Sequence, residues 1–478
     1  MTAPDGSLKV QGEIPIIADA PPSDKLPPGE WMKINLFSSP FNSILTVIIL
    51  AFGALLAFLF ARWIIASDWR IVRVNLRLFM IGRFPREELW RPWVSGYFVM
   101  TAIGLTSGAI ARSAHELALE QELPTEKESL GSLFRRFWAI FAVMALYVSF
   151  ARTPLPFIGL AGVLVLLVVM RELGWNLPAA IRRSVVYIGA LLLLASVFAL
   201  AGSSNLMGWT VGFVVFLWVG SELGRTVVES GMAGMAKRQA PALVAGVVAY
   251  FIVRAIPLEG FGWEDWGGLH LTLFTAVVGV TLGMPIGTLL AIARRSDLPL
   301  VQSASVLFIE FIRGVPLISL LLFSQLLLPL FLPRDMERPA SLTLAIFVIM
   351  FFSAAYIAEI VRGGLQAVPK GQTEAAQASG MSAFNVQRLI VLPQALRASI
   401  PAMVGQFIAL FKDTSLLFFI GIAEFLEVAQ IANAQNEFVG GSLAPLTYAF
   451  VAAGFWAFAY TLSKESRRLE IKLGVGTR

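Results

Sequence analysis

Long apolar stretches alternate with short polar ones along most of the chain, and this pattern predicts a bundle of membrane-spanning helices. A helix needs about 20 apolar residues to cross the hydrocarbon core of a bilayer. About twelve windows come near that length: 43–66, 94–111, 136–151, 155–171, 185–202, 208–224, 240–257, 270–293, 303–332, 340–362, 398–423 and 446–463. The window 303–332 is too long for one straight helix, so we expect it to tilt or to break at Pro316 or Pro329. The fold class is therefore an all-α polytopic membrane protein.

The distribution of Lys and Arg between the windows predicts which loops face the cytoplasm. Basic residues gather in every second loop of the C-terminal half and in its tail, and the loops between them are acidic or mixed. The basic positions are Arg294, Arg295, Lys370, Arg388, Arg397, Lys464, Arg467, Arg468 and Lys472. These segments should be cytoplasmic, and the same alternation extended backward places the N-terminal tail in the cytoplasm as well.

Residues 70–91 do not follow this rule, because they carry six arginines in a loop that the alternation places outside. Arg70, Arg73 and Arg77 recur at near-helical spacing among apolar residues. This pattern favours an amphipathic helix lying along the membrane interface. The alternative is that 94–111 does not span the membrane and that the basic segment is cytoplasmic.

Composition agrees with lipid as the solvent and excludes several classes of function. Hydrophobic residues make up 57% of the chain and charged residues 14%, against about a quarter charged in soluble domains. The chain has no cysteine and only two histidines, which excludes thiolate sites and most imidazole chemistry, so we expect no bound metal or cofactor. Loop arginines explain the net charge of +6 better than binding to nucleic acid does.

The chain divides into three parts by composition. Residues 1–40 are polar and proline-rich and should form a disordered cytoplasmic tail. Residues 41–262 should form a membrane region of about seven helices, and residues 263–478 a module of five spans.

A cytoplasmic segment within the module, residues 369–393, has an unusual construction. Pro369 suits the start of a helix, and the run from Glu374 to Ser379 is rich in alanine. Gly380 is placed to end that helix in a left-handed cap. Ser382 can cap a second helix, which should finish before Pro393. We therefore expect a short elbow of two helices, although an ordinary amphipathic loop fits the pattern equally well.

The spacing within this segment resembles the cytoplasmic signature of the permeases of binding-protein-dependent ABC importers. In that signature Glu-Ala-Ala, three residues and Gly precede nine residues and Ile-x-Leu-Pro. The residues that match here are Glu374, Ala375, Ala376, Gly380, Ile390, Leu392 and Pro393. The resemblance implies that the elbow docks into a cleft of an ATPase subunit and transmits its closure to the spans.

Further motifs between residues 266 and 463 resemble the polar amino-acid permeases, including Phe308–Leu317 and Ala355–Leu365. Residues 35–40 are similar to the longer member of the paired permeases in general L-amino-acid systems, although the N-terminal region here is longer than that subgroup would lead one to expect. This resemblance implies four kinds of partner: a dimer of ABC ATPase subunits, a periplasmic amino-acid-binding protein, a second and shorter homologous permease, and membrane lipid. It also implies a location in the bacterial inner membrane.

Charged and polar residues also occur inside the apolar windows. Lys412 and Asp413, followed by Thr414 and Ser415, lie within the window 398–423. Each charge would cost a few kcal/mol facing lipid, so both should face the bundle interior or a cavity. A substrate pathway is one interpretation, because an amino-acid zwitterion carries matching charges. A structural ion pair, or polar groups that hold two spans together, is the other.

Two more pairs share a three-residue spacing that places both members on one helix face. They are Glu310 with Arg313 and Glu359 with Arg362. For both pairs we expect salt bridges between spans or at a gate rather than contact with substrate.

The function that the family resemblance implies is import of L-amino acids by alternating access. The chain contains no Gly-x4-Gly-Lys-Ser/Thr phosphate loop, so a separate subunit would hydrolyse ATP and this chain would not itself be an enzyme. A secondary transporter driven by an ion gradient, with 412–415 as its coupling site, is the main alternative. Such folds usually carry paired broken helices in two related halves, and no second copy of Lys-Asp-Thr-Ser is present.

Overall fold

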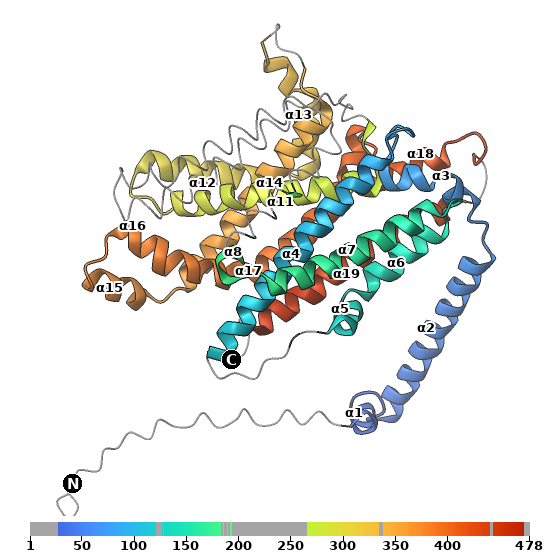
Figure 1. The fold of residues 1–478 in the computed structure, drawn as a ribbon, viewed down its shortest axis with the longest axis horizontal. Helices are drawn as coiled ribbons and strands as arrows, with labels where there is room; N and C mark the ends of the chain where they lie inside the picture. Colours follow the sequence, from blue (N-terminus) through green and yellow to red (C-terminus); the bar gives the residue numbers. More distant parts are fainter. Residues whose placement is uncertain are drawn as a thin grey trace, which may run out of the picture. The chain divides into compact units, whose positions relative to one another are not determined.

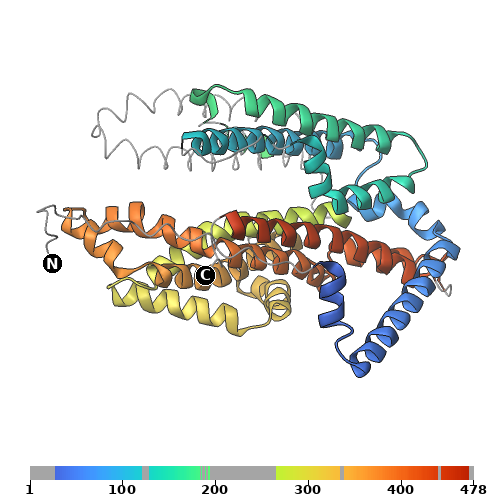
Figure 2. The same ribbon diagram turned by 90° about the horizontal axis from the view of Figure 1, so that it is seen from below.

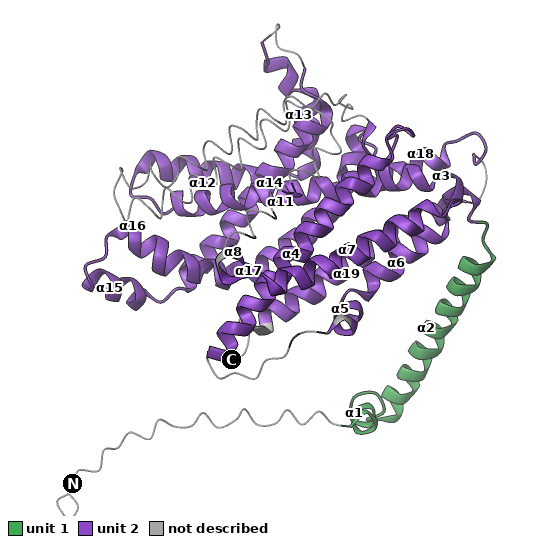
Figure 3. Ribbon diagram, in the orientation of Figure 1, with its two compact units in different colours: residues 1–68 green, residues 69–478 purple. Residues whose placement is uncertain are grey.

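The computed structural model forms two compact units, residues 1–68 and 69–478 (Figure 3). It describes residues 27–120, 127, 129–182, 185, 189, 192, 193, 265–333, 338–439 and 443–472. The predicted windows 208–224 and 240–257, and nearly all of 185–202, lie outside these residues.

The first unit consists of two helices. The short helix α1 (Pro28–Asn35) carries Glu30 in its first turn and Lys33 in its last, which suits the helix dipole at both ends. It lies within the predicted disordered tail, so that prediction is wrong for these eight residues, and residues 1–26 lie outside the described part. Helix α2 (Pro40–Ala66) starts at Ser39, whose hydroxyl accepts a hydrogen bond from the Asn42 N–H. None of its residues is buried within this unit.

Seven helical segments among the described residues are long and apolar enough to cross a membrane, or eight with one bent pair. Besides α2, these are α4 (Trp90–Glu120), α7 (Leu155–Asn176), α11 (Gly268–Ala293), α14 (Ser341–Ala367), the run 383–420, and α19 (Ala444–Lys472). The bent pair is α12 (Pro299–Gly314) and α13 (Leu317–Leu326), which meet at 101°. The window 303–332, expected to tilt or to break at Pro316 or Pro329, thus breaks at Pro316. The count of about twelve spans is not confirmed.

Helix α14 is the centre of the C-terminal module, and it packs against α11, α12, α13 and α17 (Leu392–Asp413) (Figure 1). Glycines on α11 allow the backbones of α11 and α14 to approach closely. A side chain at Gly287 would come within 2.5 Å of the Ala354 carbonyl oxygen, and one at Gly283 within 2.8 Å of Ser353. Small residues at such contacts bring membrane helices close enough for extensive dispersion contacts.

The predicted amphipathic helix in the basic segment is α3 (Arg70–Ile81), but protein rather than lipid covers its apolar face. Ile71, Val72 and Phe79 are fully buried in a cluster with Phe425 and Phe450. This cluster unites α3 with α18 (Phe425–Asn433) and α19. An interfacial helix and a helix that packs on protein share the same periodicity, so contacts between distant segments are needed to distinguish them.

A pair of amide groups also joins α3 to the chain after α18. Asn75 Nδ2 donates to Gln435 Oε1 at 3.1 Å, and Gln435 Nε2 donates to Asn75 Oδ1 at 2.7 Å. Helix α3 lies beside α18, at the end of the unit opposite the segment 369–393 (Figures 1 and 2). Helix α4 is also long enough to span the membrane. Both observations disagree with the alternative in which 94–111 does not span the membrane and the basic segment lies on the same side as the elbow.

Candidate functional site

The first arm of the predicted elbow is α15 (Lys370–Ala378), which begins directly after Pro369. It ends in a Schellman motif. The Gly380 N–H donates to the Gln377 carbonyl at 2.9 Å, and the Met381 N–H donates to the Ala376 carbonyl at 3.2 Å. Gly380 has a φ of 78°, a left-handed conformation that glycine adopts without steric cost. This geometry matches the left-handed cap expected at Gly380.

The second arm also starts as expected, because the Ser382 hydroxyl accepts a hydrogen bond from the Asn385 N–H. It does not end before Pro393, and that prediction is wrong. The chain passes from α16 (Ala383–Asn385) through a π-helical segment (Val386–Val391) directly into α17. The Leu392 N–H bonds to the Gln387 carbonyl five residues back. A wider turn relieves the clash between the proline ring and the preceding carbonyls, so the helix continues.

The elbow presents one face to solvent and anchors the other. Glu374, Ala375 and Gly380 are exposed, and the Phe384 side chain is also exposed. Ala376 is buried in a cluster with Val386 and Val391 of the second arm and with Val361 and Leu365 of α14. A displacement of the elbow would therefore be transmitted to α14 through side chains in contact.

The segment 412–415 lies where α17 gives way to a 3-10 turn, η4 (Thr414–Ile420). Thr414 is buried, and its hydroxyl donates to the Phe411 carbonyl at 2.7 Å. Asp413 and Ser415 are half-buried, but Lys412 is exposed on this single chain. The expectation that both charges face the bundle interior or a cavity stays a prediction for Lys412.

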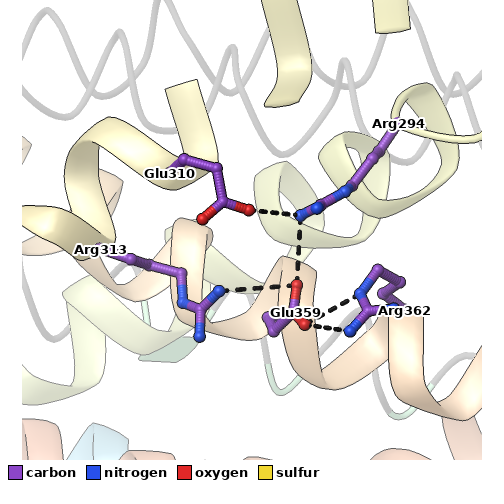
Figure 4. Close-up of polar contacts among 5 residues, drawn as sticks. All are labelled: Arg294, Glu310, Arg313, Glu359 and Arg362. Atoms are coloured by element: carbon purple, nitrogen blue, oxygen red, sulfur yellow. Dashed lines mark hydrogen bonds and ion pairs between the residues drawn. The ribbon is translucent and has the colours of Figure 1, made fainter. Parts of the chain in front are cut away.

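Five charged residues from three helices meet near one end of α14 (Figure 4). Glu359 is at the centre of this group. The Arg362 Nε donates to the Glu359 Oε1 at 2.9 Å. The Nη1 atoms of Arg294 and Arg313 lie 3.3 and 3.7 Å from the Glu359 Oε2. Arg294 also lies 3.0 Å from Glu310. The Glu359–Arg362 pair agrees with the helical spacing. Glu310 and Arg313 pair with residues of other helices, as expected of salt bridges between spans.

This network connects the C-terminal end of α11, helix α12 and helix α14 through one carboxylate. In the sequence, Arg294 only marks a cytoplasmic loop. Its role depends on where α11 ends relative to α12 and α14, for which the sequence carries no local signal. The shared carboxylate couples the positions of three helices, because movement of any one of them breaks a charge-assisted contact.

A buried carboxyl lies at the opposite end of the module. Glu424 is 0% exposed and caps α18, accepting hydrogen bonds from the Leu426 and Glu427 N–H groups at 2.8 Å each. The Thr272 hydroxyl of α11 lies 3.4 Å away, and the Gly268 N–H donates to the Ala423 carbonyl at 2.9 Å. Burial raises the pKa of the Glu424 carboxyl to about 7, although its hydrogen bonds oppose the shift.

This raised pKa predicts a pH dependence of stability. The unfolded chain releases this proton near the ordinary glutamate pKa of about 4.3, whereas the folded chain holds it up to about pH 7. Stability should therefore fall as the pH rises between these values, because the folded state binds more protons there. Glu424→Gln should flatten the dependence and stabilise the protein at pH 8 by about 1 kcal/mol. The gain from removing a buried charge is reduced because the amide nitrogen cannot accept one of the two N–H hydrogen bonds.

Thermal unfolding of the detergent-solubilised protein between pH 4.5 and 8 measures this effect. Glu437→Gln is the control, because Glu437 is an exposed glutamate at the same end of the module. An equal slope for the wild type and Glu424→Gln would contradict the prediction.

Comparison with known proteins identifies relatives of this chain. The profile of the family "Binding-protein-dependent transport system inner membrane component" matches residues 283–463. The glutamate/glutamine/aspartate/asparagine transport system permease protein BztC of Rhodobacter capsulatus is 33% identical over 453 residues, which cover 93% of each chain. The inner membrane amino-acid ABC transporter permease protein YhdY of Escherichia coli is 44% identical over 219 residues. That match covers 46% of this chain and 59% of the relative.

One solved structure is also similar in sequence. A crystal structure of an amino acid ABC transporter with histidines is 31% identical, and the match covers 43% of this chain and 92% of that chain with a TM-score of 0.38. The assignment to a family rests on the sequence matches, above all on the one that runs nearly the full length of both chains.

Proposed function

Because this chain belongs to the binding-protein-dependent permeases of amino-acid ABC transporters, we propose that it is the membrane subunit of an ATP-driven importer of L-amino acids. It is a multi-pass protein of the inner membrane. A periplasmic binding protein would deliver the amino acid, and a dimer of separate ATPase subunits would drive alternating access. A second, shorter permease would complete the pore. The name of the full-length relative points to acidic amino acids and their amides as substrates.

The construction of the elbow is the observation that carries this proposal. A lever must be rigid, must protrude, and must be joined to the part it moves. The Schellman motif at Gly380 supports the rigidity of the elbow, and exposed Glu374 and Ala375 provide a free face for an ATPase cleft. Ala376, packed with Val361 and Leu365, supports the connection to α14. Closure of the ATPase dimer would push on the exposed face and shift α14 relative to its neighbours.

The charge network around Glu359 would then hold α11, α12 and α14 in one arrangement until α14 moves during the transport cycle. Glu359 is 24% exposed and holds Arg294 of α11, Arg313 of α12 and Arg362 of α14. When α14 moves, Glu359 would break its contacts with some of these arginines and keep those with others. The packed helices would thereby change between two discrete arrangements. The polar segment 412–415 would line the pathway for the substrate where α17 changes to η4. Lys412 would then face the partner permease, since it is exposed on this chain.

Co-purification tests the proposal. After gentle detergent extraction, the chain should carry an ATPase subunit, an amino-acid-binding protein and a homologous permease, identified by mass. Uptake of radiolabelled glutamate into cells should stop when ATP is depleted and persist when an ionophore collapses the ion gradients. Uptake that persists without an ATPase and stops with the ionophore would instead identify a secondary transporter.

A further inference from the structure

One face of helix α4 packs against α7, and the opposite face does not. Its glycine face packs on α7: a side chain at Gly104 would lie 2.7 Å from the Met170 Cβ, and one at Gly108 would collide with the Arg171 carbonyl. About half a turn around the helix, Thr106, Ile110 and Ser113 line a hollow. This hollow therefore lies on the face of α4 that points away from α7.

The hollow has a volume of about 310 Å³ and is mostly apolar. Its walls come from α4 and from the chain that follows α7, where Arg182 of the short helix α8 (Ala179–Arg182) and Val185 contribute. Ile110 and Leu117 are large apolar side chains of this lining that remain exposed. Such a surface at a membrane helix suits a hydrocarbon chain.

A second hollow of about 270 Å³ adjoins the first and differs in chemistry. It shares Ser113, Leu117 and Arg182 with the first, and it adds the carboxylates Glu116 and Glu120 at the end of α4. Apolar lining thus changes to charged lining along the helix toward Glu120. Helix α8 and the C-terminus of α4 lie on the side of the unit where α15 is found (Figures 1 and 2).

Arg182 lies at the junction of the two hollows with unused hydrogen-bonding capacity. Its side chain is 8% exposed, and its Nη2 is 2.6 Å from a Glu116 oxygen. Within the described part of the chain, its buried Nε and Nη1 have no hydrogen-bond partner. Glu116 cannot satisfy them alone, because it also accepts a hydrogen bond from the Arg112 Nε at 2.9 Å. A buried guanidinium with two unpaired donors is costly and indicates a missing acceptor.

We propose that these hollows bind a zwitterionic glycerophospholipid of the leaflet on the side of the elbow, with its phosphate at Arg182. A rotation of the Arg182 side chain would bring its covered Nε–H and Nη1–H groups to the phosphate oxygens, in the geometry that guanidinium provides for phosphate. An acyl chain follows the apolar hollow past Ile110. The ammonium of the headgroup faces Glu120, which makes an ethanolamine headgroup fit better than a glycerol one. The bound lipid would join α4 to α8, and this role goes beyond transport itself.

Native mass spectrometry of the detergent-purified protein, with all the subunits that co-purify, tests the proposal. The wild type should retain phosphatidylethanolamine in preference to phosphatidylglycerol. Arg182→Gln should weaken retention of phosphatidylethanolamine by about tenfold, as expected for the loss of a charge-assisted hydrogen bond, and Arg182→Lys should weaken it less. Arg112→Gln is the matched control, because it removes the other arginine bound to Glu116 but lines neither hollow.

Two further variants keep the test decisive if Arg182→Gln fails to fold. Ala114→Phe fills the apolar hollow and leaves the Arg182–Glu116 pair in place, so it should also expel the lipid. Glu120→Gln should remove the preference for ethanolamine. Unchanged retention in Arg182→Gln or Ala114→Phe, or an equal preference for the two lipids in the wild type, would overturn the proposal. Displacement of the lipid by millimolar inorganic phosphate would show a site for a soluble anion, and would overturn it too.

Discussion

Replacing Ala375 by arginine should abolish ATP-driven amino-acid uptake while the protein remains folded in the membrane. Ala375 lies on the exposed face of α15, where another protein can approach a helix of small residues closely. A long charged side chain there would hold a partner away without touching the buried side of the elbow. We expect uptake below about 1% of the wild-type rate, because a loss of docking energy of about 3 kcal/mol already lowers an association constant more than a hundredfold.

The measurement combines uptake into membrane vesicles supplied with ATP and the amount of ATPase subunit that co-purifies. Deletion of residues 374–380 should give the same loss, but it also removes Ala376 from its buried cluster. The point variant is therefore the sharper test of docking. Gly131→Arg is the control, because it adds the same side chain at an exposed position of helix α5 (Leu130–Arg136) that has open space around it in the described structure. Normal ATP-driven uptake by Ala375→Arg would refute the coupling role of the elbow.

Removing the carboxylate of Glu359 should have the second largest effect. Within the described structure, Glu359→Gln leaves Arg313 and Arg362 without a carboxylate in salt-bridge distance and leaves Arg294 with Glu310 alone. Removing the shared carboxylate of this half-buried cluster strands the remaining charges, so we expect a loss of about 1–2 kcal/mol in stability, between the values for exposed and for buried pairs. Uptake should fall at least tenfold, because three helices lose their common contact.

Glu310→Gln is the matched comparison, because Glu310 belongs to the same network but is 54% exposed and, among the described residues, pairs only with Arg294. Its removal should cost less than about 1 kcal/mol, as for other exposed ion pairs. Thermal unfolding in detergent gives the stabilities, and vesicle uptake gives the activities. Equal effects of the two substitutions would contradict the central position of Glu359. A double-mutant cycle between Arg313 and Glu359 would measure the contact between α12 and α14 directly.

Much of the elbow follows from local rules. The start after Pro369, the left-handed residue at Gly380 and the cap at Ser382 depend on contacts within a few residues, and sequence spacing is sufficient to predict them. The continuation through Pro393 does not follow from such rules. A π-helical turn accommodates the proline, and Val386 and Val391 within that turn are buried against α14.

The charge network illustrates a different limit. A spacing of three residues brings two side chains to one helix face, and Glu359 and Arg362 do form such a pair within α14. The same spacing is present in Glu310 and Arg313, but these two contact residues at the end of α11 and on α14 instead. A local pair is marginal by itself, worth a few tenths of a kcal/mol. Tertiary contacts therefore decide which partner each charge takes.

Hydropathy, proline geometry and capping act over short distances along the chain. The residues alone were therefore enough to predict lipid as the solvent, the helical class, a tilt or break at one of two prolines in 303–332, and the position of the elbow. Three features needed the packed structure: α3 packs on α18 and α19, Arg294 joins Glu359, and Arg182 is buried between two hollows. Each of these depends on which helix faces which. Lipid and protein offer nearly the same apolar surroundings to a helix, so hydropathy cannot make that choice.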